Sequence, residues 1–178
     1  MKALVFGETG QVATELALRV PVGIEITALG RAGADLSDPA ACVEAIETAR
    51  PDVVINAAAY TAVDRAEDEE ALAMIVNGEA PTEMAQICAR LEIPFLHVST
   101  DYVFEGSGTT PWLEDDETAP QNAYGRSKLA GEEGVRAAGG QYAILRTSWV
   151  FSAHGANFVK TMLHLASTRD QLTIVSDQ

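Results

Sequence analysis

The first sixteen residues, MKALVFGETGQVATEL, constrain the fold more than any other stretch of the chain. Residues 3–6 form an apolar run of strand length, as expected for a strand buried on both faces of a parallel sheet. Gly7 and Gly10 then allow a sharp turn and a close approach of the backbone to a ligand, and the following helix directs unpaired N–H groups at that ligand. This order of strand, glycine turn and helix predicts a site for the pyrophosphate of a dinucleotide.

The spacing of the small residues is that of a variant fingerprint. Gly7, Gly10 and Ala13 fit G-x-x-G-x-x-G with alanine in the third place, and not the G-x-G-x-x-G spacing. A small third residue still permits close packing of the helix on the strand. A glycine turn in an α/β protein that binds no nucleotide is the alternative reading of this motif.

Length and charge limit the classes of protein that the chain can belong to. The 178 residues are enough for one domain with a sizeable core, so residues 1–178 are expected to form a single domain. The formal net charge of −14 opposes non-specific attraction to nucleic acid or to an anionic membrane. The acidic clusters at 64–70 and 114–117 are interpreted as solvated surface, because no His or Cys accompanies them. We therefore expect no metal site, no nucleic acid and no membrane among its partners.

The cysteines and the N-terminus predict a cytoplasmic protein. Cys42 and Cys88 fall in predicted helices without CxxC spacing, which is typical of reduced core thiols. The N-terminus has the pattern of a strand and not of a signal peptide, and no apolar run reaches transmembrane length.

Strand and helix patterns alternate along the rest of the chain, which predicts an α/β fold with a doubly wound parallel sheet of the Rossmann type. After the first strand, further strands are expected at 24–29, 53–59, 95–98, 142–146 and 172–175. After the first helix, further helices are expected at 38–50, 67–76, 79–90, 123–136 and 157–168, with a break near Asn77 and Gly78.

Two predicted strand ends bear on cofactor choice. The second strand is followed by Arg31 and not by the carboxylate that usually holds a ribose 2′-hydroxyl, which favours NADPH, with NADH as the alternative because Asp35 is close by. Arg31 could equally be a solvated side chain. The third strand runs into Ala57, Ala58 and Ala59, whose small side chains leave room for a ligand or simply allow tight packing.

The fourth predicted strand leads to the candidate chemistry. It ends in Ser-Thr-Asp-Tyr at 99–102, followed by a long loop at 105–122 of the kind that is often functional. Tyr124 and Lys128 then lie four residues apart, on one face of the next helix. An ammonium beside the phenol is expected to lower the pKa of Tyr124 and so suit it to acid–base work. The alternative is a half-buried tyrosine beside a solvated lysine.

The motifs together resemble the extended short-chain dehydrogenase/reductase superfamily, and within it the dTDP-4-dehydrorhamnose reductases. The segments that carry the resemblance are GETGQVATEL (7–16), NAAAYTAVDRAE (56–67), STDYVFEG (99–106), AYGRSKLAGE (123–132) and RTSWVF (146–151). The resemblance implies a catalytic triad of Thr100, Tyr124 and Lys128. It places the sugar near Thr100, Asp101, Tyr102 and Trp149, and the cofactor near Gly7, Thr9, Gly10, Gln11, Val12, Arg31, Asp35, Leu36, Ala57, Ala58, Ala59, Tyr60, Tyr124 and Lys128.

The resemblance also implies a reaction. Hydride would pass from NADPH to C4 of the 4-keto sugar, Tyr124 would protonate the carbonyl oxygen, and Thr100 would hydrogen-bond the same oxygen. Lys128 would hold the nicotinamide ribose and tune Tyr124. Related sugar-nucleotide dehydratases carry Asp-Glu after the threonine, whereas this chain has Asp101-Tyr102, which disfavours dehydration.

Relatives continue past residue 178 into a smaller lobe that completes the site for the nucleotide-sugar substrate. The resemblance therefore implies that this chain has the cofactor half and most catalytic groups but lacks much of the substrate grip, so that it binds NADPH yet turns over poorly. Two alternatives stay open: another epimerase or reductase of the superfamily, or a non-catalytic partner resembling the regulatory β subunit of methionine adenosyltransferase. A homodimer is one arrangement that the sequence leaves open. His97, His154 and His164 are interpreted as structural. Glu15 is interpreted as a solvated helix carboxylate, although some relatives use this surface for metal-linked association.

Overall fold

A parallel sheet forms the centre of the computed structural model, which describes residues 1–107 and 109–174. Within these residues the sheet has five strands in the order β2-β1-β3-β4-β5, and every neighbouring pair is parallel. The strands are β1 (Lys2–Phe6), β2 (Glu25–Leu29), β3 (Val53–Asn56), β4 (Phe95–Thr100) and β5 (Tyr142–Thr147). The predicted Rossmann-type architecture is therefore confirmed.

The predicted sixth strand is not formed. Residues 172–174 have no strand partner, and Val175, the last residue of that prediction, lies outside the described residues. The apolar pattern of residues 172–175 was suited to a strand, but a strand also needs a hydrogen-bonded neighbour. The third strand is also shorter than expected, since it ends at Asn56 and leaves the alanines in a loop.

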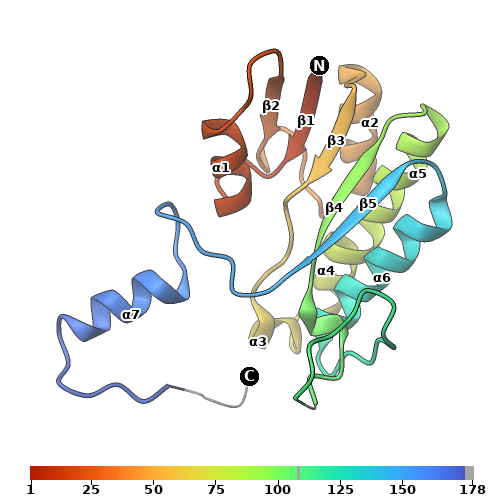
Figure 1. Ribbon diagram of the computed structural model, residues 1–178. Coiled ribbons are helices and arrows are strands. Elements are labelled where there is room, and N and C mark those ends of the chain that lie inside the picture. The colour runs from red at the N-terminus through yellow and green to blue at the C-terminus, as the bar shows by residue number, and fades with distance from the viewer. Residues whose placement is uncertain (108, 175–178) are drawn as a thin grey trace.

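The helices cover the two faces of the sheet unequally (Figure 1). Helix α1 (Gln11–Leu18) covers one face beside β1 and β2, whereas α2 (Pro39–Ala49), α4 (Glu70–Met74), α5 (Ala80–Arg90) and α6 (Ala123–Ala138) cover the other. Right-handed crossovers explain this unequal cover. Only the connection from β1 to β2 runs toward the β2 edge of the sheet, so its helix, α1, lies on the opposite face from the helices of the other connections. The short α3 (Val63–Ala66) lies near the carboxyl ends of the strands, and α7 (Phe158–Ala166) lies apart from the layered body.

The main core lies between the sheet and the helices of the fuller face. Leu4 and Phe6 of β1, Val54 of β3, Ile46 of α2 and Ile87 of α5 pack together there and are at most 1% exposed. Cys42 and Cys88 are free thiols buried in the same core. No helix in the described part of the chain combines the length and the apolar character needed to cross a membrane.

Helices α4 and α5 are joined without a break, which corrects the prediction of an interruption at Asn77 and Gly78. A π-helical turn (Ile75–Glu79) connects them. Pro81 lies in the first turn of α5, where it has no N–H to donate and its ring would clash with the carbonyl four residues earlier, that of Asn77. The wider π turn displaces this carbonyl toward α6, so the helix continues past the proline.

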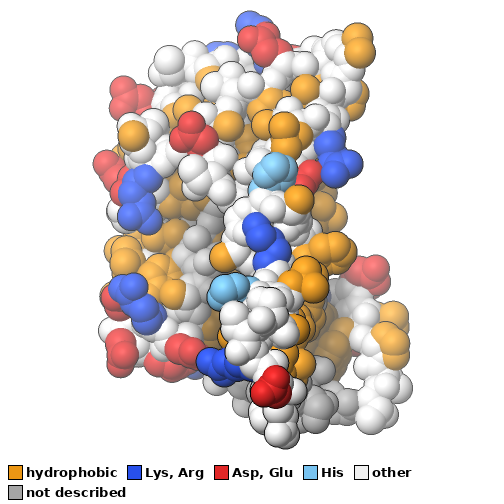
Figure 2. Space-filling model, turned by 90° about the vertical axis from the view of Figure 1, so that its left-hand side faces the viewer, with side chains coloured by type: hydrophobic (Ala, Val, Ile, Leu, Met, Phe, Trp, Pro, Cys, Tyr) orange, Lys and Arg blue, Asp and Glu red, His pale blue; other side chains and the backbone are white. Residues whose placement is uncertain are grey.

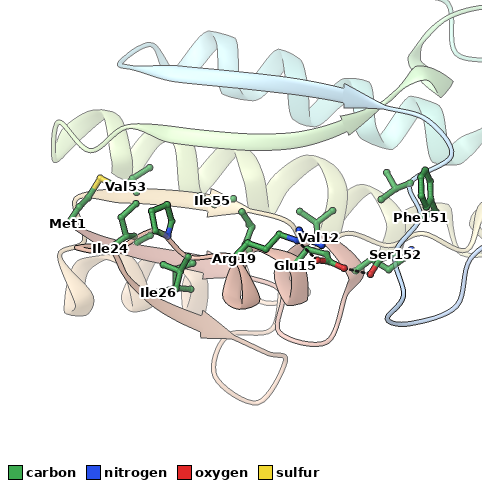
Figure 3. Close-up of a pocket in the computed structure, with 16 residues that line it drawn as sticks. Met1, Val12, Glu15, Arg19, Ile24, Ile26, Val53, Ile55, Phe151 and Ser152 are labelled. Carbon is green, nitrogen blue, oxygen red and sulfur yellow. Dashed lines mark hydrogen bonds and ion pairs between the residues drawn. The ribbon is translucent and has the colours of Figure 1, made fainter.

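The thinly covered face of the sheet holds an apolar groove. It has a volume of about 410 Å³ and is lined by α1, by the sheet and by the segment after β5. Figure 3 shows Ile24, Ile26, Val53 and Ile55 along its floor. Hydrophobic side chains are also exposed on α7, which Figure 2 shows from this side, with Phe158 40% and Leu163 69% exposed.

Candidate active site

The glycine turn after β1 has the geometry of a dinucleotide cradle. Gly7 has φ +110°, which favours glycine, and a Cβ there would lie 3.3 Å from backbone atoms of Ala57 and Ala58. Gly10 is the N-cap of α1, no side chain caps this helix end, and a Cβ at Gly10 would meet nothing within 4 Å. Open space in front of free N–H groups at a helix N-terminus fits a pyrophosphate.

The side chains beyond Gly10 face away from this cradle. Gln11 Oε1 accepts a hydrogen bond from Asn157 Nδ2 at 2.9 Å, and Val12 lines the apolar groove. Their predicted part in cofactor binding stays a prediction, and their side chains are engaged elsewhere. Thr9 is exposed in the turn itself.

The end of β2 holds the residues predicted to select the cofactor. Arg31 Nε lies 3.8 Å from Asp35 Oδ2, and the arginine side chain is 87% exposed and so free to bind a phosphate. A hydrogen bond from the Ser37 backbone N–H holds the pKa of Asp35 below its usual value. Leu36 packs into the main core, and its predicted contact with the cofactor stays a prediction.

Asn77 fixes the loop that follows β3, a role that the sequence did not reveal. Its Oδ1 accepts from Tyr60 N at 2.8 Å, and its Nδ2 donates to Tyr60 O and to Ser127 Oγ, both at 3.0 Å. The side chain is 1% exposed. The π turn thereby holds Ala57–Tyr60 against α6, beside the glycine cradle. A buried asparagine inside an otherwise apolar helical pattern was the available signal.

Thr100 and Asp101 lie where β4 ends. Thr100 Oγ1 donates to Asp101 Oδ1 at 3.1 Å and accepts from Tyr102 N at 3.3 Å. Ser148, just past β5, donates to Asp101 Oδ2 at 2.6 Å and so ties the two strand ends together. The carboxyl ends of parallel strands are where open α/β sheets bind their ligands.

Tyr124 lies beside this strand end on the first turn of α6. Asn122 caps the helix by accepting from Gly125 N at 2.7 Å, and the rings of Tyr102 and Tyr124 meet edge to face at 5.6 Å. Burial raises the pKa of Tyr124, while the nearby Thr100 hydroxyl opposes this rise. The expectation that Lys128 lowers this pKa is therefore wrong.

Lys128 is buried and not solvated. It is 1% exposed, its Nζ donates to Val98 O at 2.8 Å, and the same Nζ lies 3.2 Å from His97 Nε2. Burial lowers the pKa of Lys128 to about 8. The spacing of four residues did place Tyr124 and Lys128 on one face of α6, and that face is turned toward β4. The reading of a solvated lysine beside a tyrosine is excluded.

Glu132 is a buried anion one turn further along α6. Its carboxylate accepts from Arg146 Nε at 2.9 Å and Nη2 at 2.7 Å, and from Arg136 Nη2 at 2.8 Å. Burial alone would raise its pKa, but the two guanidinium groups outweigh burial and lower it. The ion pair between Glu132 and Arg146 joins α6 to β5, next to the strand ends that carry the candidate chemistry.

Trp149 lies further from the centre of the site. It has φ +54°, is 58% exposed and rests edge to face on Phe158 of α7, with the ring centroids 4.8 Å apart. Its predicted contact with a sugar stays a prediction. Within residues 1–107 and 109–174 no group of three or more His, Cys, Asp or Glu is placed to hold a metal ion, and Glu15 is bound by Arg19 and Ser152.

The sheet order, the glycine cradle at its carboxyl edge, and the threonine, tyrosine and lysine gathered beside it define a Rossmann-type α/β protein with the site layout of the short-chain reductases. The chain belongs to the family described as the RmlD substrate binding domain, whose model matches residues 1–178.

Comparisons with individual proteins agree with the family. The chain is 50% identical over 178 residues to a dTDP-4-dehydrorhamnose reductase of Burkholderia thailandensis, which covers all of this chain and 60% of that protein. It superposes with a TM-score of 0.95 on a crystal structure of the Clostridium acetobutylicum enzyme, at 38% identity over 100% of this chain and 64% of the other. The Bacillus anthracis enzyme in complex with NADP also gives 0.95, at 33% identity, over 99% of this chain and 63% of that one. The chain thus spans about 60% of the length of its curated relatives.

Proposed function

We propose that this chain is the cofactor-binding and catalytic part of a reductase that converts dTDP-4-dehydrorhamnose to dTDP-rhamnose with NADPH. The observation that carries the proposal is the meeting of Thr100, Tyr124 and Lys128 at the carboxyl end of β4, next to the cradle at Gly7 and Gly10. Relatives that match at least 99% of this chain are named dTDP-4-dehydrorhamnose reductase, and one of them is described in complex with NADP.

The residues fit a dinucleotide. The free N–H groups at the N-terminus of α1 would hold its pyrophosphate, and Arg31 would bind a 2′-phosphate, which supports NADPH over NADH. The loop Ala57–Tyr60 would pass alongside the cofactor, with Asn77 keeping it in place. When bound, the cofactor supplies the hydride.

Tyr124 is suited to act as the acid of a reduction. A phenol whose pKa is raised by burial keeps its proton at neutral pH and can give it to the oxygen of a ketone as negative charge develops there. The Thr100 hydroxyl would hydrogen-bond the same oxygen. Asp101 is bound by Thr100 and Ser148, so it holds the strand ends in position and does not need to act as an acid.

The experiment is a pair of substitutions that separate binding from chemistry. Gly10→Ala adds a Cβ where the protein itself has open space, so the chain should fold normally and bind NADPH at least tenfold more weakly. Tyr124→Phe should keep NADPH binding and lose reduction of dTDP-4-dehydrorhamnose. Binding is measured by titration with NADPH and NADH, and reduction by the loss of NADPH absorbance.

Reduction is expected to be slow with these 178 residues alone and faster with a chain of the relatives' length. Equal NADPH binding by wild type and Gly10→Ala would contradict the proposed cradle. Reduction that survives Tyr124→Phe would contradict the proposed acid. The two free, buried thiols support a cytoplasmic location.

A further inference from the structure

The carboxylate of Glu8 lies against the end of β2. Strands β1 and β2 are parallel neighbours whose last residues, Phe6 and Leu29, are paired, and the Gly7 N–H donates to Leu29 O at 2.9 Å. The turn after β1 therefore runs beside the turn after β2. A Cβ added to Gly30 would overlap Glu8 Oε2 and would lie 3.3 Å from Glu8 Cβ. The Glu8 side chain thus occupies the space that a side chain at position 30 would fill.

Position 30 is where a dinucleotide-binding fold usually carries its ribose acid. An Asp or Glu at the end of the second strand, about 20 residues beyond the glycine turn, hydrogen-bonds the ribose 2′-hydroxyl of NAD. This chain has Gly30 there, which has no side chain. The structure supplies a carboxylate from the glycine turn itself, because Glu8 directly follows Gly7. The two positions are adjacent in space but distant in sequence, so the pattern of β2 alone does not reveal this acid.

The other acid near the end of β2 is engaged elsewhere. Asp35 Oδ1 accepts from the Ser37 N–H at 2.9 Å, and Asp35 Oδ2 lies 3.8 Å from Arg31 Nε. Both oxygens of Asp35 therefore have partners within the segment that follows β2. Glu8, in contrast, is exposed beside the cradle. Of the two carboxylates, that of Glu8 is the better placed to accept a hydrogen bond from a ribose hydroxyl.

Arg31 and Glu8 have opposite effects on the same part of the cofactor. The adenosine ribose of a bound dinucleotide lies between the pyrophosphate at the N-terminus of the first helix and the end of the second strand. The guanidinium of Arg31 attracts a 2′-phosphate there. A carboxylate accepts a hydrogen bond from a 2′-hydroxyl but repels a 2′-phosphate. The preference for NADPH that Arg31 alone would give is therefore reduced by Glu8.

We propose that Glu8 is a specificity-determining residue for the cofactor and takes the place of the ribose acid that β2 lacks. Its carboxylate accepts from the 2′-hydroxyl of NADH and opposes the 2′-phosphate of NADPH. The inference rests on the proposed function for the binding of a dinucleotide at Gly10. It adds to that function the residue that sets the balance between the two dinucleotides against Arg31.

Titrations with NADPH and NADH test the proposal without turnover. Glu8→Gln removes the charge, so the ratio of the NADH to the NADPH dissociation constant should rise by about tenfold, mainly through tighter NADPH binding. Glu8→Ala also removes the hydrogen-bond acceptor and should weaken NADH binding as well. Adenosine 2′,5′-bisphosphate and adenosine 5′-phosphate differ only in the 2′-phosphate, so their ratio should change in the same direction. A ratio that is the same in wild type and both variants would overturn the proposal.

Returning the carboxylate to β2 provides a rescue experiment. Gly30→Asp combined with Glu8→Ala puts an acid at the usual position, in the space that Glu8 leaves, and should restore the NADH binding that Glu8→Ala loses. Gly30→Ala alone meets only the side chain of Glu8, which can move aside, so the chain should fold and bind NADH as weakly as Glu8→Ala does. A folded double variant that binds NADH no better than Glu8→Ala would overturn the proposal. If the double variant does not fold, the ratio measured for Glu8→Gln still decides.

The matched control is Glu25→Gln, which removes the same charge at the start of β2 and should leave the ratio unchanged. If Asp35 were the ribose acid, Asp35→Asn would weaken NADH binding and Glu8→Ala would not, and this result would overturn the proposal. A wild-type chain that binds neither dinucleotide would contradict the proposed function and this inference with it. A wild-type chain that binds both, with a ratio that does not depend on Glu8, would overturn this inference alone.

Discussion

Gly131→Ala should destabilise the protein by forcing α6 away from the π turn. A Cβ at Gly131 would overlap the Asn77 carbonyl oxygen and would lie 3.1 Å from Pro81 Cγ. The carbonyl belongs to the backbone, so it cannot rotate away as a flexible side chain would. Relieving such an overlap costs about 3 kcal/mol, at the upper end of overpacking effects. Alanine returns about 1 kcal/mol through its better helix propensity.

The net loss in the free energy of unfolding is therefore about 2 kcal/mol, which for a domain of this size lowers Tm by roughly 4–8 °C. Thermal unfolding followed by circular dichroism measures this change. Gly10→Ala is the control, because its Cβ has open space and its stability should stay within about 0.5 kcal/mol of wild type. Amide exchange at Tyr60 should quicken in Gly131→Ala, since Asn77 holds that N–H. A Gly131→Ala chain as stable as wild type would refute the close contact between α6 and the π turn.

Three further substitutions or reagents test other parts of the structure. Glu132→Gln leaves the guanidinium of Arg146 without its anion and should lower the free energy of unfolding by about 2 kcal/mol, as measured by urea unfolding. This value is below that for fully buried pairs because the Arg146 side chain is 15% exposed. Because the folded pKa of this glutamate is lowered, its contribution is present above about pH 4.5 and is lost as the pH falls below that value, so wild type and Glu132→Gln should converge in acid. Cys42 and Cys88, whose pKa values burial raises to about 12, should react with a thiol reagent at pH 8 only after denaturant is added; fast labelling of the native chain would contradict their burial. Asn122→Ala removes the cap of α6 and should cost about 1 kcal/mol in thermal unfolding, whereas Asn122→Ser should restore most of it.

The parts of the fold that the sequence predicted are those that local chemistry determines. The apolar run before Gly7 could only be a strand, and the glycine turn and helix follow within a few residues. The alternation of strands and helices then predicted a parallel sheet, which the structure has. The convergence of Thr100 with Tyr124 followed from the rule that strand ends carry the chemistry.

The errors arose where a residue's partner is distant in sequence. Gly78 and Pro81 are typical helix breakers, and nothing local shows that a π turn can accommodate both by displacing a carbonyl toward α6. The spacing of Tyr124 and Lys128 predicted that they share one face of α6, but it did not predict which strand packs against that face. The strand carrying His97 packs against that face, so burial, and not the ammonium, dominates the pKa of Tyr124.

The π turn also changes the phase of the helix in which it lies. Each residue of an α-helix advances by about 100°, so one extra residue in a turn rotates everything beyond it by that angle. Ala73, before the turn, faces a small cluster with Ala123 and the ring of Tyr124, whereas Met84, after it, faces the main core. One continuous helix thus has two apolar sides in different directions, one beneath the ring of Tyr124 and one beneath the sheet. Deleting a single residue from the π turn would restore an ordinary α-helix. Only one of the two apolar sides could then face its present neighbours, either the Tyr124 cluster or the main core.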